Sequence, residues 1–310
     1  MRWRLKARIQ NTVAKLPFGS ERVYYAIQRT LGGLRSGQNH PIERFKAAVQ
    51  IVDWIESAGR DFAGKRIVEI GTGHMVNLPT AFWLMGAGQT VTVDLNPYLS
   101  ATLVKESNHF VRAHEPEVLN LFGARSEDEA FRSRFRQLVS FSGTLDELLE
   151  LMNVTYLPRI GASVLPLPDH SADYHVSNTV LEHIPPAGLL EMLGEAKRVL
   201  RQSGLLVHII DPSDHFSHSD DSISAVNFLQ FSDAEWDRLA GNQFMYQNRL
   251  RAPHYIQLFK RGGVQLLRTE KIVDAESVAA LRNGFRADKR FEQLTPEELA
   301  TTRVCIMGHF

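Results

Sequence analysis

Two glycines and two carboxylates in the first third of the chain have the residue types and spacing of a ligand-binding cradle. An apolar run over 66–70 contains Glu69 and continues directly into Gly71-Thr72-Gly73, and a second apolar run ends in Asp94. Glycine permits a tight turn at the end of a strand and lets a ligand approach the backbone. The pattern predicts a buried strand, a binding turn, and two carboxylates that face amines and hydroxyls of the ligand.

This cradle differs from that of dinucleotide-binding proteins. Their fingerprint is G-x-G-x-x-G, with a pyrophosphate on the following helix N-terminus, whereas Val76 occupies the position of the third glycine here. A negative Glu69 suits a pyrophosphate poorly and a cationic aminoacyl sulfonium better. Asp94 follows Gly71 by 23 residues, which is where an acidic residue meets ribose hydroxyls.

Two later segments complete a recognisable series. A short apolar run over 174–178 leads into Val180-Leu181-Glu182-His183-Ile184, and Arg198-Val199-Leu200 precedes a glycine turn and an apolar strand. With these motifs in this order, the chain resembles the class I S-adenosylmethionine-dependent methyltransferases over roughly 65–211 and the C-terminal hairpin. In that family the first strand carries E-x-G-x-G, the second ends in an acidic ribose ligand, and the fourth leads into an L-E-H-like turn.

The resemblance implies S-adenosylmethionine as the cofactor. The residues that it assigns to cofactor binding are Glu69, Gly71, Thr72, Gly73, Asp94, Leu95, Ala162, Ser163 and Asn178. Three positions depart from the family pattern: Met75 replaces the usual third glycine, Ser203 replaces the first glycine before the fifth strand, and Gly161-Ala162-Ser163 stands where an aspartate usually meets the adenine amine. Adenine would then be held by Ser163 or by backbone groups.

The resemblance also implies an α/β fold, a Rossmann-like doubly wound sheet of seven strands with an antiparallel last strand. The apolar runs predict strands at 66–70, 90–94, 153–160, 174–178 and 204–210, a closing hairpin of 264–273 and 302–308, and helices that include 42–59, 187–201 and 252–261. We expect a basic arm over 1–46 and a methyltransferase domain over 47–310. A helical insert at 97–152 would cover the substrate, and a polar and aromatic cap insert spans 211–251.

Composition narrows the class of protein. The chain has 310 residues, 44% of them hydrophobic, which supports a sizeable core. Its formal net charge is zero, so nothing global favours nucleic acid. The one cysteine, Cys305, excludes an internal disulfide and fits a reducing cytosol. We find neither the apolar h-region of a signal peptide nor the roughly 20-residue apolar run of a spanning helix, and we predict a cytoplasmic protein.

Charge is concentrated at the N-terminus. Residues 1–46 hold ten basic and two acidic side chains, a net +8 in a chain of zero net charge. Leu5, Ile9, Val13 and Leu16 recur at helical spacing among arginines and lysines, which predicts a short basic amphipathic helix. Residues 1–16 could lie on an anionic membrane surface, or the helix could pack on the core or on a partner.

The acceptor side is expected after the fourth and fifth strands. His183 follows the fourth, and Asp211, Asp214, His215 and His218 follow the fifth. Three interpretations stay open. His215 or His183 could be a general base oriented by Asp211 or Asp214. Asp211, Asp214, His215 and His218 could bind a divalent metal that orients hydroxyls. The segment could also be a hydrogen-bonded loop that closes over the cofactor.

Asn248, Arg249 and Arg251 lie beyond the cap and could bind a carboxylate or phosphate of the acceptor, or form salt bridges at a helix start. Together these features predict a methyltransferase that most plausibly O-methylates a hydroxylated small molecule, a glycan or an envelope-associated acceptor. An aminopropyltransferase on the same fold and a non-catalytic cofactor-binding partner are the alternatives. The sequence does not predict the oligomeric state.

Overall fold

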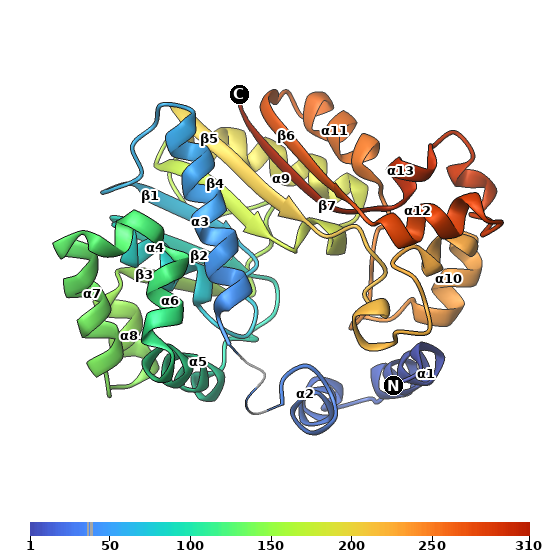
Figure 1. Cartoon of the computed structure of the whole chain (residues 1–310), viewed down its shortest axis with the longest axis horizontal. Helices are drawn as coiled ribbons and strands as arrows, with labels where there is room; N and C mark the ends of the chain where they lie inside the picture. Colours follow the sequence, from blue (N-terminus) through green and yellow to red (C-terminus); the bar gives the residue numbers. More distant parts are fainter. Residues whose placement is uncertain (36, 38–39) are drawn as a thin grey trace.

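The computed structural model describes residues 1–35, 37 and 40–310, and the part of the expected polar loop at Ser36, Gln38 and Asn39 lies outside the described residues. Seven strands form one sheet in the order β3-β2-β1-β4-β5-β7-β6 (Figure 1). The strands are β1 Arg66–Ile70, β2 Gln89–Asp94, β3 Val154–Pro158, β4 Ala172–Asn178, β5 Leu200–Ile210, β6 Gln265–Val273 and β7 Thr301–His309. The doubly wound sheet with its antiparallel last strand is confirmed. Strand β5 starts earlier than predicted, at Leu200, so it takes in the expected end of the preceding helix.

The strand order creates one crevice. Strands β1 to β5 pair in parallel, and β7 pairs antiparallel with β5 and with β6. The chain winds outward in opposite directions from β1 and β4, so the connections leave the carboxyl ends of these two strands toward opposite sides. Ligands of open parallel sheets bind in the crevice at such a reversal, and both sequence motifs with chemistry lie at these two strand ends.

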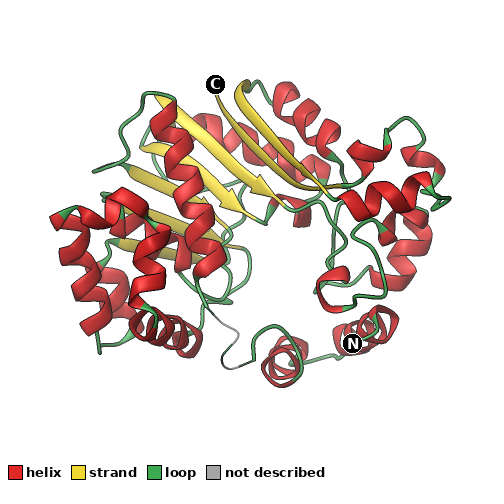
Figure 2. Ribbon diagram, viewed as in Figure 1, coloured by secondary structure: helices red, strands yellow, loops and turns green. Residues whose placement is uncertain are grey.

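Helices cover both faces of the sheet (Figure 2). Helices α3 (Ile42–Ser57) and α4 (Asn77–Leu84) pack on one face, and α9 (Pro186–Val199) and α11 (Ala252–Arg261) pack on the other. In α3 the buried residues Phe45, Ala48, Ile51, Val52 and Ile55 recur every three or four positions, as a helix with one apolar face requires. Because α3 already belongs to the core, the arm ends before Ile42 rather than at residue 46.

The helical insert does not cover the substrate side as a whole. Its helices are α5 (Ala101–Ala113), α6 (Glu115–Leu121), the 3-10 turn η1 (Gly123–Glu127), α7 (Glu129–Ser140) and α8 (Leu145–Leu151). The buried rings Phe122, Phe131 and Phe135 join the same core as α3 and α4. At the crevice, the Ser100 amide at the start of α5 donates to the His74 carbonyl at 3.1 Å. The apolar faces of the insert helices are satisfied beside the sheet.

The cap builds a separate core with the N-terminal helix. It contains η3 (Ser217–Ser219), η4 (Asn227–Gln230) and α10 (Asp233–Ala240), and it packs against α12 (Ala275–Arg282), η5 (Lys289–Phe291) and α13 (Pro296–Leu299). From helix α1 (Trp3–Ala14), Trp3 contacts Phe216, Phe231 and Trp236 at ring-centroid distances of 5.6 to 6.2 Å. Helix α1 and the cap are therefore one packed unit.

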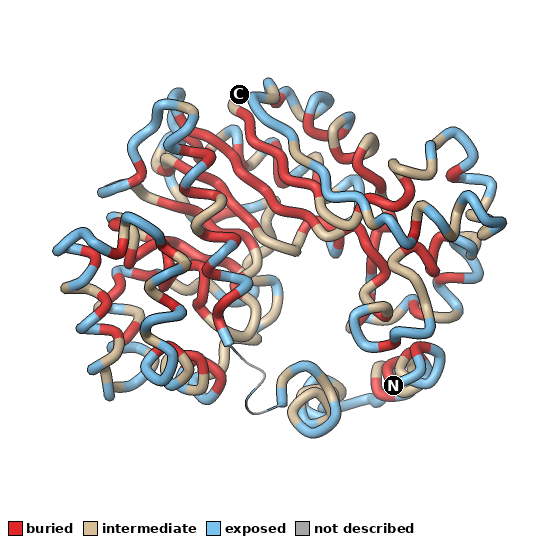
Figure 3. The backbone as a smooth tube through the Cα atoms, viewed as in Figure 1, coloured by how far each residue is buried: buried red, intermediate tan, exposed pale blue. Residues whose placement is uncertain are grey.

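Only part of the apolar repeat predicted in the first turns is buried. Trp3, Ala7, Gln10 and Val13 are buried in α1, whereas Leu5 is 54% exposed and Leu16, beyond the helix end, is 40% exposed. Figure 3 shows buried, intermediate and exposed segments alternating along the N-terminal helix. Both sides of the helix thus carry apolar residues, and the more aromatic side packs on the cap. No helix in the described ranges is both long and apolar enough to cross a membrane.

Helix α2 (Ser20–Thr30) connects the cap to the other side of the crevice. Tyr24 stacks on Phe244 of the cap with ring centroids 4.1 Å apart. One residue on, the Tyr25 ring lies 6.0 Å from that of His74, and its hydroxyl is 3.3 Å from the Ser100 hydroxyl. Helix α2 therefore contacts the cap through Tyr24 and the cradle side of the crevice through Tyr25.

We predict that Trp3→Ala detaches the arm while leaving the sheet folded. Removing a buried tryptophan costs about 3 to 5 kcal/mol, and only the small core shared by α1 and the cap loses these contacts. Hydrogen exchange of the α1 amides should accelerate roughly a hundredfold or more, with strands β1 and β4 unchanged. Leu5→Ala, on the exposed side of the same helix, is the matched control. Equal exchange in the two variants would contradict this packing.

Candidate active site

The glycine turn after β1 meets the turn after β4. Gly71 has a φ of +87° and Gly73 a φ of +66°, in the left-handed region that favours glycine. A Cβ on Gly71 would lie 2.3 Å from Cγ2 of Val180. The first glycine is therefore required by its backbone angle and by this close approach, which occurs where the strand order reverses.

The two predicted carboxylates of the cradle have different roles in the turn. Asp94 accepts hydrogen bonds from the Gly73 amide at 2.8 Å and the Asn96 amide at 2.9 Å, so it fixes the glycine turn to the end of β2. Glu69 is buried and accepts from the Thr92 hydroxyl at 2.5 Å. Burial raises the pKa of Glu69 to about 7. A cationic group at this carboxylate would favour its ionised form.

The other predicted cofactor residues gather around the same strand ends. Leu95 is 69% exposed directly after Asp94. Ala162 and Ser163 are half-buried after β3, whose last residue pairs with Asp94 in the sheet. Asn178 ends β4, and its carbonyl accepts from Arg44 at 3.1 Å. The sequence did not single out Tyr25, His74 and Tyr98, whose rings lie beside the cradle.

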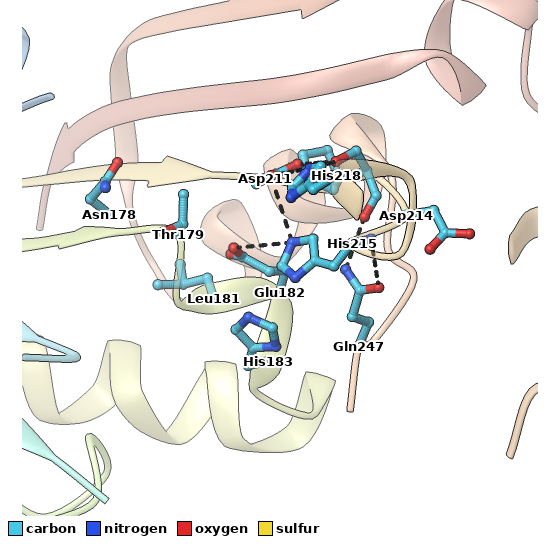
Figure 4. Close-up of polar contacts among 12 residues, drawn as sticks. Asn178, Thr179, Leu181, Glu182, His183, Asp211, Asp214, His215, His218 and Gln247 are labelled. Atoms are coloured by element: carbon cyan, nitrogen blue, oxygen red, sulfur yellow. Dashed lines mark hydrogen bonds and ion pairs between the residues drawn. The ribbon is translucent and has the colours of Figure 1, made fainter. Parts of the chain in front are cut away.

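A second group of side chains meets on the acceptor side (Figure 4). Glu182 lies in the 3-10 turn η2 (Leu181–His183) after β4, and Asp211 follows β5. His215 Nε2 is 3.6 Å from Asp211 Oδ2 and 3.9 Å from Glu182 Oε1. His218 Nε2 is 3.5 Å from Asp211 Oδ2. The structure thus brings together three of the four residues predicted after β5. We call the side chains of Glu182, Asp211, His215 and His218 the acceptor cluster.

The polar atoms of this cluster are poorly satisfied. Glu182 is 1% exposed, and neither of its carboxylate oxygens has a hydrogen-bond partner at normal geometry among the described residues. His215 Nε2 also lacks one. Burial raises the pKa of Glu182 well above its usual range and lowers the pKa of His215 to about 3. Unsatisfied buried polar atoms are costly, so the cluster has the character of a binding site.

Glu182 was missed as a site residue, because the sequence offered it only as one letter of the family's L-E-H turn. Its neighbour His183 was predicted, and it lies at the edge of the cluster with its ring centroid 5.0 Å from that of His215. His183 Nδ1 is 2.8 Å from the Tyr246 carbonyl. Because a carbonyl can only accept, Nδ1 carries the proton and Nε2 keeps a lone pair.

Asp214 does not join the acceptor cluster, contrary to its assignment as a catalytic residue and as a metal ligand. Its carboxylate accepts from the Phe216 amide at 2.9 Å and from the Asn227 side chain at 3.0 Å. Figure 4 shows it turned away from His215. Asp214 is a structural residue of the cap, since its two hydrogen bonds shape the loop that carries His215.

Asn248, Arg249 and Arg251 are also structural, contrary to their assignment to substrate binding. Arg251 is fully buried and donates to the carbonyls of Pro212, Leu299 and Thr301. Arg249 pairs with Asp233 and with two cap carbonyls. Asn248 donates to the carbonyls of Leu181 and Ile184, on either side of the turn that holds Glu182. Most of their side-chain donors bind backbone carbonyls of the cap and of the neighbouring turns.

Comparison with known proteins agrees with the fold. Residues 152–208 match the family model described as a methyltransferase domain. A search among curated proteins found no match. Similar solved structures include an S-adenosylmethionine-dependent methyltransferase from Mesorhizobium loti, at 13% identity, 83% coverage of this chain, 96% of that chain and a TM-score of 0.43. The PH0226 protein from Pyrococcus horikoshii has 12% identity, 92% and 97% coverage and a TM-score of 0.48.

A third is a putative sarcosine dimethylglycine methyltransferase from Galdieria sulphuraria, at 14% identity, 84% coverage of this chain, 85% of that chain and a TM-score of 0.44. Similarity at this level carries no information on the substrate of our chain. The cradle itself supports the cofactor: Gly71 leaves no room for a side chain beside Val180, and the buried carboxylate of Glu69 lies at the end of β1, where an ammonium group would neutralise it.

We predict that S-adenosylmethionine binds more tightly as the pH rises from 6 to 8. Burial raises the pKa of Glu69 to about 7, so its carboxyl is mostly neutral at pH 6 and mostly ionised at pH 8, when it attracts a cationic ligand. Calorimetry should show a roughly tenfold gain in affinity over this range. Glu69→Gln should remove the gain, and Glu43→Gln, an exposed carboxylate on α3, should keep it. A pH-independent affinity in the parent protein would contradict the assignment.

Three observations now agree: the sheet order with its reversal between β1 and β4, the Glu69–Gly71–Gly73–Asp94 cradle at that reversal, and the family match over the segment from the end of α8 to β5. S-adenosylmethionine is the cofactor that this cradle and this domain imply. A methyltransferase-domain match over 152–208, the Rossmann-like sheet order and the S-adenosylmethionine cradle are therefore what this chain shares with the class I S-adenosylmethionine-dependent methyltransferases.

Proposed function

We propose that this protein transfers a methyl group to a hydroxyl of a small-molecule or glycan acceptor. The observation that supports this most is the acceptor cluster, in which buried carboxylate and imidazole atoms lack donors. These atoms accept hydrogen bonds, and a polyol or phenol supplies O–H donors. The cluster lies beyond β4 and β5 and shares the turn after β4 with the cofactor cradle, since Val180 contacts Gly71.

The proposed mechanism is an in-line displacement. When bound, S-adenosylmethionine supplies an electrophilic methyl group. The side chains of the cluster then have to orient the hydroxyl and remove its proton. We assign the proton to Asp211, because its side chain is 20% exposed and lies beside His218, which is 54% exposed and can pass the proton to solvent. His215 and His183 position the hydroxyl, since burial lowers the pKa of both rings and makes them weak bases.

We predict that Asp211→Asn lowers kcat by about 10² to 10⁴, the usual contribution of general base catalysis. Affinity for S-adenosylmethionine should be unchanged, because Asp211 lies on the acceptor side. Methyl transfer to a panel of hydroxylated acceptors is the measurement. Asp221→Asn, an exposed carboxylate of the same cap segment, is the control and should retain full turnover. Unchanged turnover in the Asp211 variant would refute its role, and cofactor binding without transfer to any acceptor would favour a non-catalytic partner.

We also propose that the arm places the enzyme on an anionic membrane surface, near an envelope-associated acceptor. One side of α1 is bound to the cap, and the opposite side exposes Leu5; Leu16 and Phe18, the latter at 91% exposure, follow the helix end. Exposed Arg2, Arg4 and Arg8 accompany them. Apolar side chains among arginines on one helix face are typical of segments that lie in a lipid headgroup layer.

We therefore predict that the protein cosediments with vesicles containing phosphatidylglycerol and much less with phosphatidylcholine alone. Added salt should weaken the interaction, since arginine side chains attract the headgroups. Phe18→Ser combined with Leu5→Ser should reduce binding several-fold. Leu267→Ser, which alters an equally exposed leucine on β6 away from the arm, should bind like the parent. Equal sedimentation with neutral and anionic vesicles would speak against this contact.

A further inference from the structure

Three side chains at the acceptor side have the arrangement of a metal site. One potential ligand atom from each of Glu182, His183 and His215 lies within 4.8 Å of the other two. We infer that these residues bind a divalent transition-metal cation, of the zinc, manganese or iron class, on which the acceptor hydroxyl is held. The catalytic use of this ion depends on the function proposed above, whereas its binding does not.

The carboxylate is the first argument. Glu182 is 1% exposed, and among the described residues neither oxygen has a hydrogen-bond partner at normal geometry, although the backbone amides of Glu182 and Asp211 lie near the carboxylate. The guanidinium of Arg44 is near enough to act on its charge, but it donates its hydrogen bonds to Thr179 Oγ1 and the Asn178 carbonyl. A buried carboxylate without well-placed donors is destabilising unless a cation compensates it. A bound metal ion would offset that cost.

The imidazoles are the second argument. His183 donates from Nδ1 to the Tyr246 carbonyl at 2.8 Å, which fixes the tautomer and leaves Nε2 free. This backbone partner is the usual support of a metal-binding histidine. His215 has an unpartnered Nε2, and its own backbone amide donates to Gln247 Oε1 at 3.3 Å. Gln247 in turn donates to the Ser213 carbonyl at 2.9 Å, so the loop that carries His215 is held in place.

The ligand set decides the class of metal. Two imidazole nitrogens and one carboxylate oxygen suit zinc, manganese, iron or cobalt, whereas magnesium and calcium prefer oxygen ligands alone. Three protein ligands leave coordination positions open, as in catalytic sites. This set differs from the predicted Asp211, Asp214, His215 and His218, because Asp214 turns into the cap and the turn after β4 contributes two ligands instead.

The ion would make the hydroxyl easier to deprotonate. A hydroxyl oxygen bound to a divalent metal has a lowered pKa, and Asp211, whose Oδ2 lies 3.6 Å from His215 Nε2, is placed to accept the proton. The oxygen then forms a bond to the methyl carbon as the carbon–sulfur bond breaks, and the sulfonium becomes a neutral thioether. The metal keeps its oxidation state throughout.

Metal binding is tested on the full chain after chelator treatment and dialysis. We expect calorimetric titration with Zn²⁺ and Mn²⁺ to give one site per chain, and elemental analysis to confirm the stoichiometry. Co²⁺ should produce visible absorption bands that arise from its protein ligands. Glu182→Gln, which is isosteric, and His183→Ala should each weaken binding at least a hundredfold. Binding of S-adenosylmethionine by each variant shows that it is folded.

His218→Ala is the matched control, because this exposed histidine lies beside Asp211 but outside the trio. It should bind the ion like the parent protein. Absence of binding to the parent at millimolar Zn²⁺ and Mn²⁺, or equal binding by the parent and Glu182→Gln, would overturn the inference. Methyl transfer to hydroxyls that persists in metal-free protein would overturn the catalytic use of the ion while leaving the proposed function intact. Stoichiometric metal binding without methyl transfer to any hydroxyl would leave the metal site intact and contradict the proposed function.

Discussion

The close approach of Gly71 and Val180 is the contact on which the rest of the site depends. It joins the turn after β1 to the turn after β4, at the point where the strand order reverses. The first turn holds the cofactor carboxylates and the second leads into Glu182 and His183. With a side chain at Gly71 the two turns would separate, because a Cβ would lie 2.3 Å from Val180 Cγ2. The absence of one side chain therefore sets the distance between the cofactor cradle and the acceptor cluster.

Buried polar residues then fix the acceptor side. Asn248 donates to carbonyls on both sides of the Glu182 turn, and Arg251 links the start of the cap to the segment before β7. A polar side chain buried in this way has one favourable geometry, because each lost hydrogen bond leaves a buried carbonyl without a partner. The cap is thereby held in one position relative to the sheet, more strictly than by apolar packing alone.

The sequence predicted the parts of the molecule that depend on local pattern. Helix 252–261 was predicted at its observed bounds, and the cradle followed from glycine and carboxylate spacing. Prediction from the sequence failed where contacts between distant parts of the chain decide which side chains are buried or bonded. Asn248, Arg249 and Arg251 look like a binding set in the sequence because nothing local shows that carbonyls far along the chain use their donors. Both sides of α1 carry apolar residues, and only the position of the aromatic cap shows which side is buried. Glu182 was in a motif, yet only the fold shows that its oxygens lack partners.

Helix α2 makes contacts on both sides of the crevice, with Tyr24 against Phe244 of the cap and Tyr25 against His74 beside the cradle. On the cradle side α2 also contacts Ser100 through the Tyr25 hydroxyl at 3.3 Å, and Arg29 forms an ion pair with Glu106 at 2.6 Å. Ring contacts and one ion pair are weak compared with a packed core. The arm is thus the part of the enclosure that opens at least cost, and opening it separates α2 from the cradle while α1 stays on the cap. The rate at which used cofactor leaves would then be governed by a hinge between two N-terminal helices, remote in sequence from every residue that performs the chemistry.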